Sequence, residues 1–404
     1  MVTSVNDLEL PEVDLFGLDR AEVIAKFEVV SRQHWIARMP FGFSLMRYED
    51  VVATLRDRRF HSAVGLVIPM QGSGDDPGSR GQRESILTME GPPHARLRRL
   101  VAPAFTPKSA DRLRPFMREV VDGLVDAFAA SGRCELVSDV CDPYPIPIIC
   151  ELLGAPKSDW KLFSAWATDI FRIFNNDIEN DAEKIRTASD ELDAYVRSMI
   201  DERRSRPAHD LLSDMIAAEE AGDRLSTDEL VMMTEAVLMA GTDTTRNQLA
   251  CAVALFTEHP DQWKLLAERP ELASNAVEES MRYLGAVRGT VRVASEDIEY
   301  RDVLFPAGTL VATSLAGANF DPSVWPDPQT FDITRESSGQ PQMTFGSGIH
   351  FCLGANLARA ELQEALPLLA RRMPDLGTYA PVEFKPPTVG IWGPSKLPLT
   401  FTPS

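Results

Sequence analysis

The chain has 404 residues, 44% hydrophobic and 25% charged, a composition typical of a globular protein with a large buried core. Its net charge of -19 argues against a nucleic-acid-binding protein, because phosphate contacts require clustered Lys and Arg. The five cysteines are too widely spaced to indicate a zinc site or a disulfide framework: Cys134, Cys141, Cys150, Cys251 and Cys352.

The segment from Met1 to Leu15 is acidic and polar, with no basic start followed by an apolar run. No later stretch offers the roughly 20 apolar residues that a membrane span requires. We therefore expect a soluble, reduced, cytoplasmic protein that is monomeric and has no membrane anchor. Four of the cysteines are expected to be small core residues.

Apolar periodicity predicts a mainly helical chain with a minor β portion. Helices are predicted over 19–32, 48–56, 94–101, 109–131, 147–153, 158–173, 180–205, 208–220 and 271–284. Strands are predicted near 43–48, 291–295, 298–300, 303–305 and 309–313. No repeat or linker divides the sequence, so we predict a single domain over residues 1–404.

The stretch from Val64 to Ser85 is rich in Gly, Ser, Asp and Pro, and a loop of this length is typically a functional lid or a disordered segment. The basic helix that follows begins after Gly91-Pro-Pro93. Its His94 and Arg98 are four residues apart and therefore point the same way. This pair fits a solvated basic face and a binding site for an anion equally well.

The longest predicted helix begins at a capping box, Ser226-Thr-Asp-Glu229, and ends near Glu258 before His259-Pro260. Its middle, Ala240-Gly-Thr-Asp-Thr-Thr245, contains a run of poor helix formers between apolar segments. Such local violations cluster at functional sites. The sequence predicts either a tolerated kink or a groove in the helix that admits a small ligand beside an acid and an alcohol.

Glu279 and Arg282 lie on the next long helix at a spacing that forms an ion pair, which alone is a very weak signal. Near the C-terminus, the segment Phe345-Gly-Ser-Gly-Ile-His-Phe-Cys-Leu-Gly354 precedes a helix predicted over 355–372. Its glycines permit a tight loop, and Cys352 lies where helix N–H groups favour a thiolate. A single thiolate can be a structural cysteine or a ligand of haem iron.

The whole spacing Phe-Gly-x-Gly-x-His-x-Cys-x-Gly resembles the haem-binding loop of the cytochrome P-450 family, and the other segments occur in the order found in that family. The resemblance implies that Cys352 ligates the iron of haem b within a loop that includes Phe345 and Gly354. It implies the cytochrome P-450 fold, with haem between the long central helix and the C-terminal helix.

The same resemblance assigns roles to the remaining candidates. Ala240 and Gly241 belong to the oxygen-binding segment, in which Thr244 contacts dioxygen and Asp243 relays protons from solvent. The propionate candidates are His94, Arg98, Arg292 and His350. Glu279 and Arg282, joined by Arg335, form a buried architectural group.

The implied function is a haem-dependent monooxygenase, which inserts one oxygen atom of O2 into an organic substrate and reduces the other to water. Electrons must come from outside, because no flavin, dinucleotide or iron–sulfur fingerprint occurs, and a ferredoxin with its ferredoxin reductase is the expected donor. A basic docking patch for this donor is expected at Arg98, Arg99, Arg359, Arg371 and Arg372, although these residues also fit ordinary charged helix faces.

Three alternatives remain open: a peroxide-driven enzyme of the same fold, a non-enzymatic haem sensor or electron carrier, and an oxidase outcome such as desaturation or coupling. The substrate is expected to be a hydrophobic small molecule. The segments expected to line its pocket are Val64–Met89, Leu238–Thr244, Val287–Val291 and Val389–Trp392, with Arg288 the only charge near the third.

Overall fold

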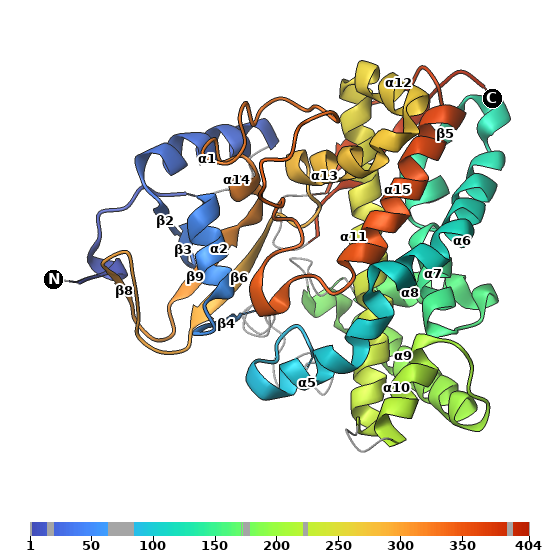
Figure 1. Cartoon of the computed structure of the whole chain (residues 1–404), viewed down its shortest axis with the longest axis horizontal. Coiled ribbons are helices and arrows are strands. Elements are labelled where there is room, and N and C mark those ends of the chain that lie inside the picture. Colours follow the sequence, from blue (N-terminus) through green and yellow to red (C-terminus); the bar gives the residue numbers. More distant parts are fainter. Residues whose placement is uncertain are drawn as a thin grey trace.

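The computed structural model describes residues 2–13, 20–63, 85–170, 172, 178–220, 225–385 and 391–403. Figure 1 shows most of the helices gathered on one side of the molecule, and the main sheet, with some helices beside it, on the other. The long helix α11 (Thr227–Glu258) runs through the helical part, and α15 (Ala355–Arg372) lies beside it. The N-terminus is on the sheet side, whereas the C-terminus is on the helical side.

Helices make up most of the described chain, as predicted. The others are α1 (Arg20–Gln33), α2 (Tyr48–Arg56), α5 (Gly91–Val101), α6 (Pro107–Asp126), α7 (Pro145–Leu153), α8 (Trp160–Ile170), α9 (Ile178–Ser205), α10 (Leu211–Glu220), α12 (Pro260–Glu268), α13 (Ala273–Tyr283) and α14 (Leu315–Asn319). The predicted helix over 109–131 is shorter than expected, because α6 ends at Asp126 and only a short 3-10 turn follows.

The β portion consists of small sheets. The main sheet has the strand order β2-β3-β9-β6-β4, with β3 and β9 parallel and the other pairs antiparallel. Its strands are β2 (Ile36–Met39), β3 (Gly42–Leu45), β4 (Phe60–Ser62), β6 (Gly289–Ala294) and β9 (Leu310–Ser314). The smaller sheets use β1 (Thr3–Ser4), β5 (Arg133–Glu135), β7 (Ile298–Tyr300), β8 (Val303–Phe305), β10 (Gly377–Thr378), β11 (Glu383–Phe384), β12 (Pro394–Lys396) and β13 (Pro398–Thr400).

Helix α11 begins at the predicted capping box: Ser226 accepts from the Glu229 N–H, and the Glu229 carboxylate accepts from the Ser226 N–H. It ends at Glu258, as expected. The helix is continuous through Ala240–Thr245, and the kink or ligand groove predicted for this segment stays a prediction. Thr242 and Thr244 donate to the carbonyls of Met239 and Ala240, a type of hydrogen bond that often bends a helix.

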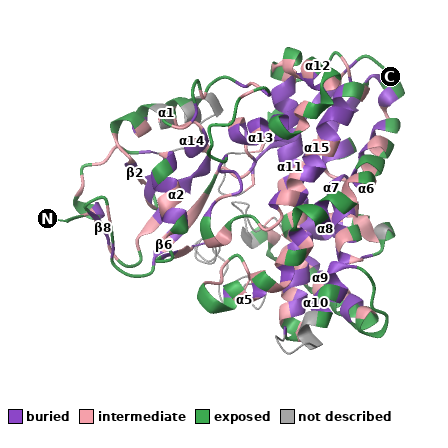
Figure 2. Ribbon diagram, viewed as in Figure 1, coloured by how far each residue is buried: buried purple, intermediate pink, exposed green. Residues whose placement is uncertain are grey.

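The C-terminal half of α11 is buried on every side, from Leu249 to Phe256. Figure 2 shows this buried surface continuing across α11 and α15 in the centre of the helical part. Each fully buried large apolar side chain contributes roughly 1.5–3 kcal/mol, so this pair of helices is a rigid base for the residues between them. None of the described helices combines the length and apolar character needed to cross a lipid bilayer.

Part of the predicted substrate pocket cannot be placed. Residues 64–84 of the first pocket segment lie outside the described residues, as do Val389 and Gly390 of the last one. Ile391 and Trp392 are described. The Ile391 backbone forms an isolated bridge with Val287, so the third and fourth predicted segments lie side by side.

Candidate active site

The Cys352 loop is a tight turn between the main sheet and α15. Gly346 and Gly348 both have positive φ, at 70° and 72°, which is the reason each is glycine. Gly348 also packs closely against α2, since a Cβ there would lie 2.0 Å from the Leu55 carbonyl oxygen. The loop closes where the Cys352 N–H donates to the Phe345 carbonyl at 2.9 Å.

Cys352 differs from the other cysteines because it is exposed, whereas Cys134, Cys141, Cys150 and Cys251 are buried, as predicted for core residues. Although Cys352 is solvent-exposed, the protein around it partly desolvates the thiol, and this is the largest influence on its pKa, which it raises. A hydrogen bond from the Gly354 N–H and the charges of Arg98 and Arg359 act in the opposite direction. We expected the helix N-terminus to favour the thiolate by itself; it does not suffice here, and a metal ion would complete the deprotonation.

Predicted propionate ligands from three separate segments come together near this loop. The rings of His94 and His350 have centroids 4.6 Å apart. His350 Nε2 lies 2.9 Å from Glu90 Oε1, which also accepts from the Ser62 N–H at 2.6 Å. Ser62 pairs in register with Arg292 in the main sheet. Glu90, immediately before α5, was not predicted, because an isolated Glu carries no sequence signal.

Two of these side chains are buried and lack a partner among the described residues: His94 lacks a hydrogen-bond partner at Nε2, and Arg292 lacks a carboxylate. His94 Nε2 has no hydrogen-bond partner among the described residues. Arg292 is only 4% exposed and donates to Thr290 Oγ1 and the Val291 carbonyl, and no described carboxylate forms an ion pair with it. Burial lowers the pKa of Arg292 to about 10, a shift that the charge of Glu90 opposes. An additional carboxylate at this place would satisfy both groups, so the residues fit a haem propionate.

Arg98, the fourth propionate candidate, comes from the same helix as His94. It donates to the carbonyl of Phe351, next to Cys352. Burial lowers the pKa of Arg98, and the nearby Cys352 acts in the opposite direction. The structure therefore brings all four candidates to the neighbourhood of the Cys352 loop.

The Ala240–Thr245 segment of α11 presents side chains in different directions. Ala240 is exposed, and the Thr244 hydroxyl donates to its carbonyl at 2.8 Å. Thr244 oxygen lone pairs thus stay available to accept a hydrogen bond. Gly241 has a packing explanation, since a Cβ there would lie 2.3 Å from Ile149 Cδ1 of α7.

Asp243 is buried and ion-paired. Its Oδ1 lies 2.5 Å from Arg246 Nε and 3.9 Å from Lys385 Nζ, and accepts from Asn247 Nδ2 at 3.1 Å. Arg246 in turn lies 3.5 Å from Asp142, which is closer to solvent. A chain of charged groups therefore leads from the surface to Asp243. Sequence reasoning identified Asp243 but none of these partners.

Glu361 on α15 is a further buried carboxyl that the sequence did not reveal. Burial raises its pKa to about 8, and Thr245 Oγ1 donates to its Oε2 at 3.1 Å. Its Oε1 has no partner among the described residues. Thr244 and Thr245 are adjacent in sequence but have different partners: Thr244 donates to the Ala240 carbonyl and Thr245 to Glu361.

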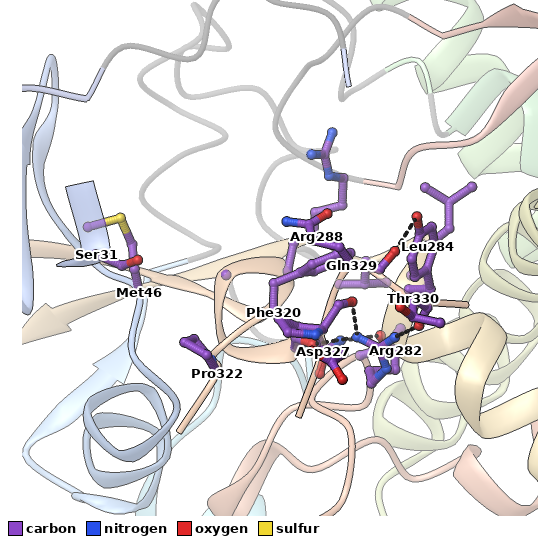
Figure 3. A pocket seen from close by; sticks show the side chains of 18 of the residues that line it. Ser31, Met46, Arg282, Leu284, Arg288, Phe320, Pro322, Asp327, Gln329 and Thr330 are labelled. Atoms are coloured by element: carbon purple, nitrogen blue, oxygen red, sulfur yellow. Dashed lines mark hydrogen bonds between the residues drawn. The ribbon is translucent and has the colours of Figure 1, made fainter. Parts of the chain in front are cut away.

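The predicted architectural group is confirmed. Arg282 binds Glu279 through two hydrogen bonds, Nε to Oε2 at 2.7 Å and Nη2 to Oε1 at 2.8 Å. Arg335 Nε joins Glu279 at 3.1 Å. Arg282 also donates to the backbone carbonyls of Pro328 and Thr330, in the segment before Arg335. Figure 3 shows Arg282 next to Asp327 and Thr330.

A cavity of about 340 Å³ lies beside Arg282, between α1, α13, α14 and the segment 327–330. None of its described lining residues is Cys352, Asp243 or Thr244. The carbonyls of Asn319, Pro328 and Thr330, which line the cavity, already accept hydrogen bonds from Arg282. In Figure 3 the Arg288 side chain points away from Arg282. We therefore assign the chemistry to the Cys352 side and not to this cavity.

The predicted basic docking patch is partly neutralised. Arg359 pairs with Glu278 at 2.6 Å, and Arg372 pairs with Asp122 and Asp126. The positive potential of this face is consequently weaker than the sequence alone indicated.

Comparisons with known proteins identify the family. The cytochrome P-450 family model matches residues 155–372. The chain is 37% identical to nocardicin C N-oxygenase from Nocardia uniformis subsp. tsuyamanensis, covering 90% of this chain and 91% of that protein. It is 36% identical to mycinamicin IV hydroxylase/epoxidase from Micromonospora griseorubida, covering 99% and 100%. The crystal structure of CalO2 matches with a TM-score of 0.90 and 30% identity, covering 98% of this chain and 100% of that one.

The fold and these matches define a haem-binding oxidoreductase of mainly α architecture, as predicted. The chain belongs to the cytochrome P-450 family. It is a haem-dependent monooxygenase that uses haem b and O2 to oxidise a small organic molecule, with electrons from an external redox partner.

Proposed function

We propose that Cys352 supplies the axial thiolate of the haem iron. The Gly354 N–H and the nearby charges of Arg98 and Arg359 support a deprotonated sulfur, once the metal offsets the cost of burial. A Cβ on Gly354 would meet no atom within 4 Å, so packing does not explain this glycine, whereas the approach of a flat ligand does. Phe345 closes the loop behind the cysteine.

We propose that Arg292, His94 and Arg98 bind the haem propionates. The observation that carries this assignment is the buried Arg292, which has no carboxylate partner among the described residues. His350 is in a different position, because its Nε2 already contacts Glu90. His350 would therefore bind a propionate through Nδ1, or through Nε2 if Glu90 were displaced.

Bound haem would supply the oxygen-activating redox chemistry, and the protein's residues would supply protons and keep the site ordered. Asp243 is proposed to exchange protons with solvent through the charged groups at Arg246 and Asp142. Thr244 would accept a hydrogen bond from a water in the haem site while its own O–H group stays hydrogen-bonded to the Ala240 carbonyl. Gly241 lets α11 lie against α7, which sets the position of this segment.

The substrate is proposed to be an apolar small molecule bound against Ala240, Val287 and Trp392. Substrates named for similar proteins, nocardicin C and mycinamicin IV, are organic small molecules. A ferredoxin with its reductase is the proposed electron source, and the enzyme is proposed to act as a monomer. Its five unpaired cysteines support a reducing, cytoplasmic location.

Arg292→Met tests the proposed haem site. Losing one charge-assisted hydrogen bond costs roughly 1.5–3 kcal/mol, so haem is expected to transfer to an excess of apomyoglobin about 10–100-fold faster. Arg269→Met is the matched control, since Arg269 pairs with Glu271 on the surface. Equal transfer rates for Arg292→Met and the wild type, or an equal increase in both variants, would refute the assignment.

A further inference from the structure

Three nitrogen groups converge on a single oxygen of Asp243. Arg246 Nε, Asn247 Nδ2 and Lys385 Nζ lie 2.5, 3.1 and 3.9 Å from Oδ1. Asn247 Nδ2 also donates to the backbone carbonyl of Asp243 at 2.7 Å. No described residue donates to Oδ2, although the side chain is only 6% exposed. One carboxylate oxygen is therefore held by the protein, and the other remains able to take and release a proton.

The three groups differ in where they come from. Arg246 and Asn247 are on α11, three and four residues after Asp243, so they move with it. Lys385 directly follows β11 and reaches Asp243 from outside the helix. Of the described residues that contact Oδ1, Lys385 is therefore the one contributed by another part of the fold.

Lys385 is hydrogen-bonded to two described residues that follow in the sequence, Trp392 and Gly393. The Lys385 N–H donates to the Gly393 carbonyl at 3.0 Å, and the Lys385 carbonyl accepts from Trp392 Nε1 at 2.9 Å. The Trp392 ring stacks on Phe384, with centroids 4.7 Å apart and an interplanar angle of 10°. The backbone N–H of Trp392 donates to the Ala286 carbonyl, which joins Trp392 to the start of the proposed pocket segment at Val287.

Stability does not account for Lys385. Its side chain is 31% exposed, and its amine is too far from Asp243 for a hydrogen bond, so the pair stabilises the folded protein very little. Burial lowers the pKa of the Lys385 amine, a shift that the charge of Asp243 opposes. A half-buried amine with a weak contact contributes little to folding, but it biases the orientation of the acid beside it.

We propose that Lys385 is a positioning residue for the monooxygenase reaction: it holds Asp243 Oδ1 from outside α11 and leaves Oδ2 free for proton exchange. This inference rests on the proposed role of Asp243 as the proton relay. Lys385 is hydrogen-bonded to Trp392, which is also proposed to contact the substrate. The position of Asp243 therefore depends on the same segment that forms part of the proposed pocket.

The test compares two routes to the same product, with thioanisole as the reporter substrate. With NADPH, a ferredoxin and its reductase, sulfide + O2 + NADPH + H⁺ gives sulfoxide + H2O + NADP⁺. Failed proton delivery instead gives O2 + NADPH + H⁺ → H2O2 + NADP⁺. Added peroxide brings its own protons, since sulfide + H2O2 gives sulfoxide + H2O, and so bypasses the relay.

Lys385→Met is expected to lower the yield of sulfoxide per NADPH about fivefold, with the missing electrons recovered as H2O2. The peroxide-supported rate is expected to stay within about twofold of the wild type, and Lys385→Arg to restore most of the yield. Lys396→Met is the matched control, because Lys396 pairs with Glu383 on the same hairpin, away from Asp243. Lys385→Gln replaces Lys385→Met if that variant does not retain haem.

An unchanged yield of sulfoxide per NADPH in Lys385→Met would overturn the inference. An equal decrease in the NADPH-supported and peroxide-supported reactions of Lys385→Met would also overturn it. So would an equal decrease in yield in the control Lys396→Met. Asp243→Asn, measured in the same assay, distinguishes the proposed role of Asp243 as proton relay from the proposed role of Lys385 in positioning it. If Asp243→Asn also keeps its yield, the proton-relay function itself is wrong. If Asp243→Asn loses yield and Lys385→Met does not, only the role of Lys385 is wrong.

Discussion

Asp243→Asn is expected to lower the yield of oxygenated product per NADPH about 100-fold, with H2O2 as the main product of the electrons consumed. Asn has the size of Asp and can still accept from Arg246 through its carbonyl oxygen, but its amide cannot exchange a proton near neutral pH. The measurement is the ratio of thioanisole sulfoxide and H2O2 to NADPH, with haem content and the CO spectrum checked for each variant.

Thr244→Ala is expected to change the same ratio in the same direction, and Thr245→Ala is its matched control. The two hydroxyls are adjacent in sequence, but Thr244 binds the Ala240 carbonyl and Thr245 binds the buried Glu361. Thr245→Ala should therefore lower stability without raising H2O2 release. Similar H2O2 release from both variants would contradict the assignment of Thr244.

Glu279→Ala is expected to lower the free energy of unfolding by about 3–5 kcal/mol and to release haem during purification. The reason is that two cations would be left without their carboxylate. Arg282 has a side chain only 1% exposed, and Arg335 is also largely buried. Denaturant unfolding followed by tryptophan fluorescence and by Soret absorbance measures both effects.

Glu278→Ala provides the comparison, since Glu278 is the preceding residue of α13 and pairs with Arg359 near the surface. This more exposed pair is expected to contribute less than about 1 kcal/mol. If both variants lost equal stability, the Glu279 group would not be the structural anchor described above.

The long elements were predictable because their signals are local. Helix α11 was placed correctly from a capping box at Ser226 to the stop at His259-Pro260, since each signal involves neighbouring residues. Low helix propensity at Gly241 marked the segment as unusual but did not identify the tertiary contacts made there. Ile149 fills the space beside Gly241, and the Thr side chains bond to carbonyls of their own helix.

The partners of the site residues could not be predicted. Glu90 with His350, Lys385 with Asp243 and Thr245 with Glu361 are pairs between distant segments. Periodicity decides which face of a helix is buried, but it does not specify which polar groups meet across the fold. The Glu279–Arg282–Arg335 group was predicted only because the family order of motifs supplied the third member.

The most direct test of the account is the absorption spectrum of the reduced carbon monoxide complex of Cys352→Ser. The account predicts that the thiolate-type Soret band disappears in this variant while haem is still bound. Cys134→Ser, which changes a buried cysteine of the core, should keep the band. A thiolate-type band that persisted in Cys352→Ser would contradict the central claim that Cys352 is the haem ligand.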